Sequence, residues 1–255
     1  MDFNPRFWHK RFTQQAGWTK EVRRYILQTL RATRTTPILE VGCGTGAVLS
    51  QIYQDGYHHI FGADIALSGL EFARSRNPHL RMTCADGLQL PFRNDRFAIS
   101  LCHYLLLWVT DPLVILTEMK RVTRSGGHVV VLAEPDYVAR QDEPFEMRKV
   151  GELQNMALLS LGAHIDLGSQ VKIFFEQLQL LDIHVSMLKP ASIHPTPHEE
   201  SLEWQVIAFD LQQLVDQGAI SQEQVEGFHL QDERARLEGT RRLFIPTYFG
   251  WARVP

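Results

Sequence analysis

Pro37-Ile38-Leu39-Glu40-Val41-Gly42-Cys43-Gly44-Thr45-Gly46-Ala47-Val48-Leu49 is the stretch that decides the fold. Residues 38–41 form an apolar run of strand length, three glycines follow at alternate positions, and helix-compatible residues continue to about Gly56. The stretch therefore predicts a strand, a tight turn and a helix. Such glycines let the backbone turn sharply and leave the N–H groups at the helix start facing a small ligand. A turn that only lets the helix pack closely on its strand is the alternative interpretation.

A second apolar run, residues 59–65, contains a carboxylate at its end. We expect Asp64 at the tip of the next strand, where an acid accepts hydrogen bonds from ribose hydroxyls in nucleoside-binding α/β folds. Ser68 and Glu71 have the spacing of a capping box and predict a helix that runs to about Arg76. The two stretches together predict a βαβ unit.

Apolar runs continue to alternate with helical segments as far as residue 133. Asp86 lies just after the apolar run at 80–84, where a carboxylate can accept a hydrogen bond from an exocyclic amine. Asp111 and Pro112 predict the start of a helix that Ser125-Gly126-Gly127 closes. This alternation predicts an α/β fold with a mostly parallel sheet and helices on both faces, and its further strands are expected at 80–84, 97–102 and 128–133.

The rhythm breaks twice after residue 133. We expect residues 136–164 and 198–239 to be helical cap insertions over the carboxyl ends of the strands, within a single domain of residues 1–255. Between them, Asp166 is expected to cap a helix to Leu178. The predicted helices lie at 144–161, 166–178, 201–216 and 221–237, and a strand at 183–188.

Both ends of the chain differ from this pattern. Residues 1–18 contain five aromatic side chains among basic ones and predict an N-terminal arm or lid, with a helix following from Thr19 to about Thr33. At the other end, Pro246 and Gly250 interrupt an apolar run at 243–252 and favour an edge or bulged strand.

Composition narrows the classes of partner. A net charge of −3 without a long Lys/Arg run argues against nucleic acid and favours a small molecule. The three cysteines lack metal-ligand spacing, and prolines between His194 and His198 exclude a helical metal pair, so we expect no metal. No apolar run is long enough to span a membrane and no signal sequence is recognisable, so a cytoplasmic protein without a membrane partner is expected. The oligomeric state stays open.

With these features placed, the chain resembles the class I S-adenosylmethionine-dependent methyltransferases, in particular those that act on small molecules. The resemblance implies a Rossmann-like seven-stranded sheet whose last strand is antiparallel and lies beside the sixth. Four motifs carry it: Leu39-Glu40-Val41-Gly42-Cys43-Gly44-Thr45-Gly46, Gly62-Ala63-Asp64-Ile65, Ala85-Asp86-Gly87 with Leu90-Pro91-Phe92, and Arg121-Val122-Thr123-Arg124-Ser125-Gly126-Gly127.

The resemblance also implies roles for single residues in binding S-adenosylmethionine. The glycine loop would cradle the methionine part, Glu40 would organise its amino end, and we add Arg23 as a clamp for its carboxylate. Asp64 would bind the ribose hydroxyls and Asp86 the adenine amine. The other predicted contacts are Gly42, Cys43, Gly44 and Gly46 in the loop, Ile65 and Gly87 on the faces of the adenine, and His103 beside the sulfonium.

His103 is also the first candidate for a catalytic base, because histidine titrates near neutral pH. Asp136 and Tyr137, after the fifth strand, are alternates that would orient the acceptor or relay its proton. Two other functions fit part of the pattern: a nicotinamide-dependent dehydrogenase, because Gly42-x-Gly44-x-x-Ala47 resembles a dinucleotide fingerprint, and a scaffold protein that binds the cofactor without turnover.

Overall fold

The computed structural model describes residues 4–188 and 197–255, so Pro190, His194 and Pro195 lie outside the described residues. The chain divides into two compact units. Unit 1 comprises Met1–Glu134, Gly168–Leu188 and Thr247–Pro255, and unit 2 comprises Pro135–Leu167 and Lys189–Pro246. The segments predicted as cap insertions fall in unit 2, and their role as a cap stays a prediction.

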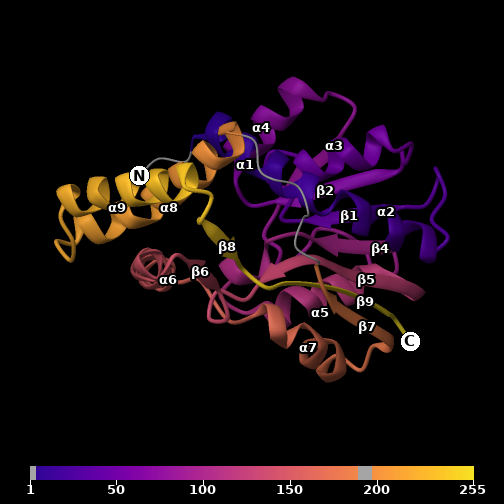
Figure 1. Ribbon diagram of the computed structural model, residues 1–255. Coiled ribbons are helices and arrows are strands. Elements are labelled where there is room, and N and C mark those ends of the chain that lie inside the picture. Colours follow the sequence, from indigo (N-terminus) through magenta and orange to yellow (C-terminus); the bar gives the residue numbers. More distant parts are fainter. Residues whose placement is uncertain (1–3, 189–196) are drawn as a thin grey trace. The chain divides into compact units, whose positions relative to one another are not determined.

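Unit 1 is built on a seven-stranded sheet with the order β3-β2-β1-β4-β5-β9-β7 (Figure 1). Neighbouring strands from β3 to β5 are parallel, whereas β9 runs antiparallel to β7. The predicted mostly parallel sheet is confirmed, and so is the antiparallel last strand implied by the resemblance. The strands are β1 Ile38–Val41, β2 Ile60–Asp64, β3 Arg81–Cys84, β4 Phe97–Cys102, β5 Thr123–Pro135, β7 Leu181–Met187 and β9 Thr247–Arg253.

Helices cover both faces of this sheet. The helices α3 and α4 connect strands on one side of β1 in the sheet order, and α5 and α7 connect strands on its other side. Because such connections are right-handed, the two pairs of helices cover opposite faces of the sheet (Figure 1). Asp111 caps α5 by accepting hydrogen bonds from the N–H groups of Leu113 and Val114. The helices of unit 1 are α1 Pro5–Trp18, α2 Lys20–Thr29, α3 Ala47–Gln54, α4 Leu67–Arg76, α5 Pro112–Val122 and α7 Val171–Gln177.

The N-terminal segment is a packed helix rather than an extended arm. Asn4 caps α1 with its side-chain oxygen, Pro5 takes the first helical position, and Ala16 is fully buried. The helix contacts both α3 and α4. Its role as a lid stays a prediction.

Four local predictions were wrong. No capping box opens α4, because Ala66 is its N-cap residue and Ser68 lies inside the helix. Asp166 does not cap α7, which begins at Val171 after a short 3-10 turn. Thr19 is the N-cap residue of α2, as expected, but its side chain makes no cap hydrogen bond, and the helix ends at Thr29 instead of about Thr33. The segment 125–127 belongs to β5 rather than to a helix end. Hydrogen bonds from outside the segment explain two of these cases: Oδ1 of Asp64 accepts from the N–H of Ala66 at 2.8 Å, and the N–H of Gly126 donates to the carbonyl oxygen of Val254 at 3.0 Å.

The last strand lies inside the sheet, not at its edge. β9 is placed between β5 and β7, and Pro246 precedes its first residue. A Cβ at Gly250 would lie 2.7 Å from the carbonyl oxygen of His184 on β7, so glycine allows the two strands to approach here. The edge expectation was wrong because Pro246 takes no part in the strand and Gly250 serves a close strand pair.

Unit 2 is mainly helical. The capping box predicted at Ser221 and Gln224 is confirmed at the start of α9. Its core joins α6 and α8 through residues such as Val150, Ile207 and Leu211. The elements are β6 Gln141–Glu143, α6 Arg148–Ser160, α8 Pro197–Asp216, α9 Gln222–Leu237 and β8 Arg242–Phe244, with β6 and β8 antiparallel.

Buried ion pairs connect β6 to α9 and to the segment before β8 in unit 2. Asp142 accepts hydrogen bonds from Arg140 and from Arg241, whose Nε donates to Asp232 at 2.7 Å. A Cβ on Gly151 would lie 2.9 Å from Nε of Arg140 and still closer to the Asp142 carboxylate. Glycine in the middle of α6 therefore leaves room for this ion pair.

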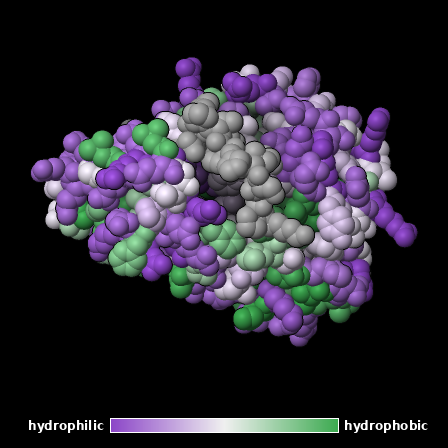
Figure 2. Space-filling view, in the orientation of Figure 1, coloured by the Kyte–Doolittle hydropathy of each residue, from purple (hydrophilic) through white to green (hydrophobic). Residues whose placement is uncertain are grey.

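The face of the protein that Figure 2 shows is mainly hydrophilic. Figure 2 shows hydrophilic side chains over much of the visible face, with hydrophobic ones gathered in the region of α7, where Ile173 is exposed. Within residues 4–188 and 197–255, no helix is both long and apolar enough to cross a bilayer.

Candidate functional site

The glycine loop joins β1 to α3 with backbone angles that favour glycine. Gly42 and Gly46 have φ of 73° and 72°. A Cβ on Gly42 would lie 2.6 Å from Cδ1 of Leu105, so the loop after β4 packs directly on the loop after β1. The predicted strand, turn and helix are confirmed, and the turn stands at the carboxyl edge of the sheet.

Asp64 lies at the end of β2, as expected, and is bonded to the glycine loop. Its carboxylate accepts hydrogen bonds from the N–H groups of Gly44 at 2.6 Å and Ala66 at 2.8 Å. One N–H group that was expected to face a ligand is therefore used by Asp64. Each carboxylate oxygen keeps a second lone pair, so Asp64 can both fix the loop and accept hydrogen bonds from a bound molecule.

A buried glutamate and a buried arginine lie beside this loop. Glu40 on β1 and Arg23 on α2 are both almost fully buried. Among the described residues, neither Oε2 of Glu40 nor Nε of Arg23 has a hydrogen-bond partner. Burial raises the pKa of Glu40 well above its ordinary value, and the Arg23 charge opposes this shift. Buried unpaired polar atoms are rare in folded proteins and call for an explanation.

The other nitrogens of Arg23 tie three helices together. Nη1 donates to the carbonyl oxygen of Ala16 at 3.1 Å, and Nη2 donates to Oε1 of Gln51 on α3 at 2.5 Å. Burial lowers the pKa of Arg23. The sequence predicted Arg23 as a ligand contact, and Nε is its one nitrogen without a hydrogen-bond partner among the described residues.

His103 follows β4 and is joined to the N-terminal helices. Its Nε2 lies 3.1 Å from the hydroxyl of Thr19, which also lies 3.5 Å from Nη1 of Arg23. Burial, together with the Arg23 charge, lowers the pKa of His103 to about 3. The imidazole is therefore neutral at physiological pH and a weak base, which favours a hydrogen-bonding role over proton abstraction.

Glu134, near the end of β5, is a residue that sequence reasoning missed. Its buried carboxylate accepts hydrogen bonds from the backbone N–H groups of Leu105 and Leu106 at 2.9 Å and of Leu107 at 3.3 Å. Burial raises its pKa to about 7, although these hydrogen bonds act in the other direction. Glu134 thus holds the loop that follows His103. The sequence pattern that could have identified Glu134 is an acid at the carboxyl end of a predicted parallel strand.

The residues predicted to contact an adenine stand after β2 and β3. Ile65 is 70% exposed, and Asp86 is exposed with Oδ1 accepting a hydrogen bond from the N–H of Leu88 at 2.9 Å. A Cβ on Gly87 would lie 2.8 Å from Cδ1 of Ile115, so this glycine allows close packing. An uncovered apolar side chain beside an available carboxylate can accept a flat ring with an amino group.

Asp136 and Tyr137 belong to unit 2. Asp136 is buried, and its Oδ1 accepts a hydrogen bond from the N–H of Ala139 at 3.2 Å. The carbonyl oxygen of Tyr137 accepts a hydrogen bond from Asn155 on α6. Their catalytic roles stay predictions.

No cluster of three or more potential metal ligands occurs in the described part of the chain. The His194 and His198 side chains lie outside the described residues. The absence of a metal stays a prediction.

Known proteins are similar to this chain in sequence over residues 39–131 and the region around them. Residues 39–131, from β1 to β5, match the family model of a methyltransferase domain. The demethylmenaquinone methyltransferase of Streptomyces griseus is 31% identical over 115 residues, which cover 45% of this chain and 50% of that protein. The malonyl-[acyl-carrier protein] O-methyltransferase of Hamiltonella defensa is 29% identical over 119 residues, 47% of this chain and 46% of that protein. The chain spans about half the length of these relatives.

Solved structures extend the likeness of the fold. Phosphoethanolamine N-methyltransferase 2 of Haemonchus contortus, in complex with S-adenosyl-L-methionine, has a TM-score of 0.58 at 14% identity and covers 92% of this chain and 52% of that one. The [4+2]-cyclase SpnF has a TM-score of 0.57 at 16% identity and covers 92% and 81%.

The sheet itself distinguishes between the alternatives. A dinucleotide-binding dehydrogenase domain has the strand order 3-2-1-4-5-6. Here an antiparallel β9 is inserted between β5 and β7, which argues against the dehydrogenase interpretation. In its sheet order and in the methyltransferase domain matched at residues 39–131, the chain is similar to the class I S-adenosylmethionine-dependent methyltransferases.

Proposed function

We propose that this chain binds S-adenosylmethionine and transfers its methyl group to an O, N or C nucleophile of a small molecule. The methyltransferase domain and the relatives named as methyltransferases support this activity. The names of those relatives give different acceptors, so the proposal extends to the class of acceptor and not to its identity.

The single observation that carries the proposal is the pair of unpartnered atoms on Glu40 and Arg23. An amino acid carries an ammonium group and a carboxylate, and the pair offers one buried acceptor and one buried donor beside the glycine loop. Oε2 of Glu40 would accept a hydrogen bond from the ammonium, and Nε of Arg23 would donate to the carboxylate. The residues present therefore fit the methionine part of the cofactor.

The nucleoside part has its own candidate partners. Asp64 would accept hydrogen bonds from ribose hydroxyls through its remaining lone pairs, and Asp86 would accept one from the adenine amine. Ile65 would pack on a face of the adenine, which would remove its exposed side chain from water.

When bound, the cofactor supplies a methyl group on a positively charged sulfur, which already activates the carbon for displacement. The chain then has to align the acceptor and exclude water. His103, neutral because of its lowered pKa, would hydrogen-bond the acceptor or hold the loop in place. Asp136 and Tyr137 are the further candidates for orienting the acceptor.

Calorimetric titration with S-adenosylhomocysteine tests the binding role of Glu40. The Glu40→Gln variant removes the charge and keeps the shape, and a lost charged hydrogen bond of roughly 1.5–3 kcal/mol corresponds to at least tenfold weaker binding. Glu71→Gln, an exposed change on α4, is the matched control and should leave the affinity unchanged. Tight binding of NADH without binding of S-adenosylhomocysteine would contradict the proposal.

A protein that binds the cofactor without transferring a methyl group is the second candidate. It would use the same unpartnered atoms of Glu40 and Arg23, because binding the cofactor does not require transfer of its methyl group. Screening metabolites for transfer of a labelled methyl group separates the two functions, because only the enzyme releases a labelled product.

A further inference from the structure

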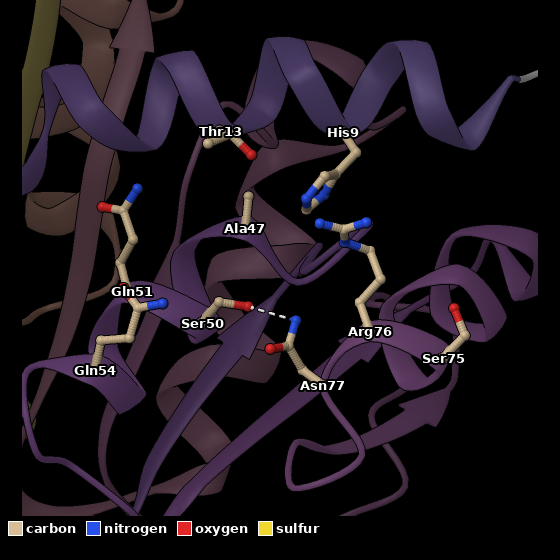
Figure 3. A pocket seen from close by; sticks show the side chains of 9 residues that line it. All are labelled: His9, Thr13, Ala47, Ser50, Gln51, Gln54, Ser75, Arg76 and Asn77. Carbon is tan, nitrogen blue, oxygen red and sulfur yellow. Dashed lines mark hydrogen bonds between the residues drawn. The ribbon is translucent and has the colours of Figure 1, made fainter.

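A polar recess of about 570 Å³ lies among α1, α3 and α4 (Figure 3). Eight of its nine lining residues have polar side chains and none of the nine is acidic. The residues that carry the argument are His9 on α1, Ser50 and Gln51 on α3, Arg76 at the end of α4, and Asn77. None of these was assigned to the cofactor, and we name the feature the His9–Arg76 recess.

Two basic side chains face one another across this recess. Figure 3 shows the His9 ring and the Arg76 guanidinium pointing toward each other. Burial, together with the Arg76 charge, lowers the pKa of His9. Among the described residues the guanidinium has no carboxylate or carbonyl acceptor, and its contact is with the ring of Phe72 at 5.7 Å. An anion placed between the two groups would be attracted by the Arg76 charge and would favour the protonated, positively charged form of His9.

Neighbouring side chains present donors to the same space. Oε1 of Gln51 accepts a hydrogen bond from Arg23, which leaves the amide N–H groups of Gln51 available. Nδ1 of His9 lies 2.9 Å from the hydroxyl of Thr45, which leaves Nε2 as its second polar atom. From these donors, the basic pair and the lack of acidic groups, we propose that the His9–Arg76 recess binds a small oxyanion of the phosphate or carboxylate class.

Residues that line the recess also form hydrogen bonds with the glycine loop. His9 contacts Thr45, and Oγ of Ser50 donates to the carbonyl oxygen of Gly46 at 2.7 Å while it accepts from Asn77 at 3.1 Å. A bound anion would therefore lie one side chain away from two residues of the loop. Resting on the proposed function, we expect anion binding and cofactor binding to change each other's affinity by the same factor.

Titration with inorganic phosphate tests the site in the absence of any cofactor. Nuclear magnetic resonance spectra are followed while phosphate replaces chloride at constant ionic strength. We expect saturable shifts that include His9, and at least fivefold weaker binding in Arg76→Gln. Arg74→Gln is the matched control, because Arg74 lies on the same helix but donates to the carbonyl oxygen of Met82. Acetate in place of phosphate tells whether a carboxylate suffices.

Two results would overturn the proposal: shifts that do not saturate, or an equal loss of binding in Arg76→Gln and Arg74→Gln, which would indicate general charge screening. Coupling is measured separately, as the affinity for S-adenosylhomocysteine with and without saturating phosphate. If the chain fails to bind S-adenosylhomocysteine, the proposed function fails while the phosphate titration still reports on the recess.

Discussion

Glu134 should make the stability of this protein depend on pH in an unusual direction. In the folded chain its pKa is raised by burial to about 7, from an ordinary value of 4.5. The folded state therefore binds a proton more tightly than the unfolded state does between these two values. Stability that is fully present below pH 4.5 is lost as the pH rises through 7.

The size of this effect follows from the shift. One pKa unit corresponds to 1.36 kcal/mol, so a rise from 4.5 to about 7 predicts a loss of roughly 3 kcal/mol between pH 4.5 and pH 8. Most acids in proteins show the opposite trend, because partners lower their pKa values. In Glu134→Gln, which does not titrate, this part of the pH dependence should disappear.

Urea denaturation of both proteins at half-unit steps from pH 5 to pH 8 measures the effect. We expect the free energy of unfolding of the parent protein, minus that of Glu134→Gln, to fall with rising pH. Subtracting the two curves removes the contribution of every other titrating group that the substitution leaves unchanged. A difference that is constant across the range, or one that grows with pH, would refute the assignment of a raised pKa to Glu134.

Further outcomes are expected at four other positions. Asp64→Ala should weaken binding of S-adenosylhomocysteine at least tenfold, measured by calorimetry, because charged hydrogen bonds are lost. In His103→Ala the rate at saturating substrate should fall by less than about 100-fold, because an imidazole with a pKa of about 3 is a weak base. A larger loss, together with a rate of the parent protein that follows the titration of a group with this pKa, would show that His103 is the base. Gly151→Ala should lower the free energy of unfolding by about 1–3 kcal/mol, because its Cβ would meet Arg140 and Asp142, whereas Gly227→Ala on α9, with open space around it, should not.

Several features could be predicted from the sequence because they depend on neighbouring residues. The glycine loop after β1, the position of Asp64 at the end of β2 and the capping box of Ser221 each follow from a local pattern of residue types. The parallel sheet also followed, because regular alternation of apolar runs and helices leaves few ways to bury both faces.

Other features were decided only when distant segments met. The sequence near Pro246 and Gly250 favoured an edge, but pairing on both sides places β9 inside the sheet. Glu134 acquires its role from three N–H groups almost thirty residues away, and Arg23 from Gln51 on another helix. Burial and long-range hydrogen bonds set the pKa values and the unpaired atoms of the site, and they depend on which chain segments pack together. Local residue patterns predicted the kind of sheet but not which distant side chains meet, so the electrostatics of the site depend on the tertiary structure.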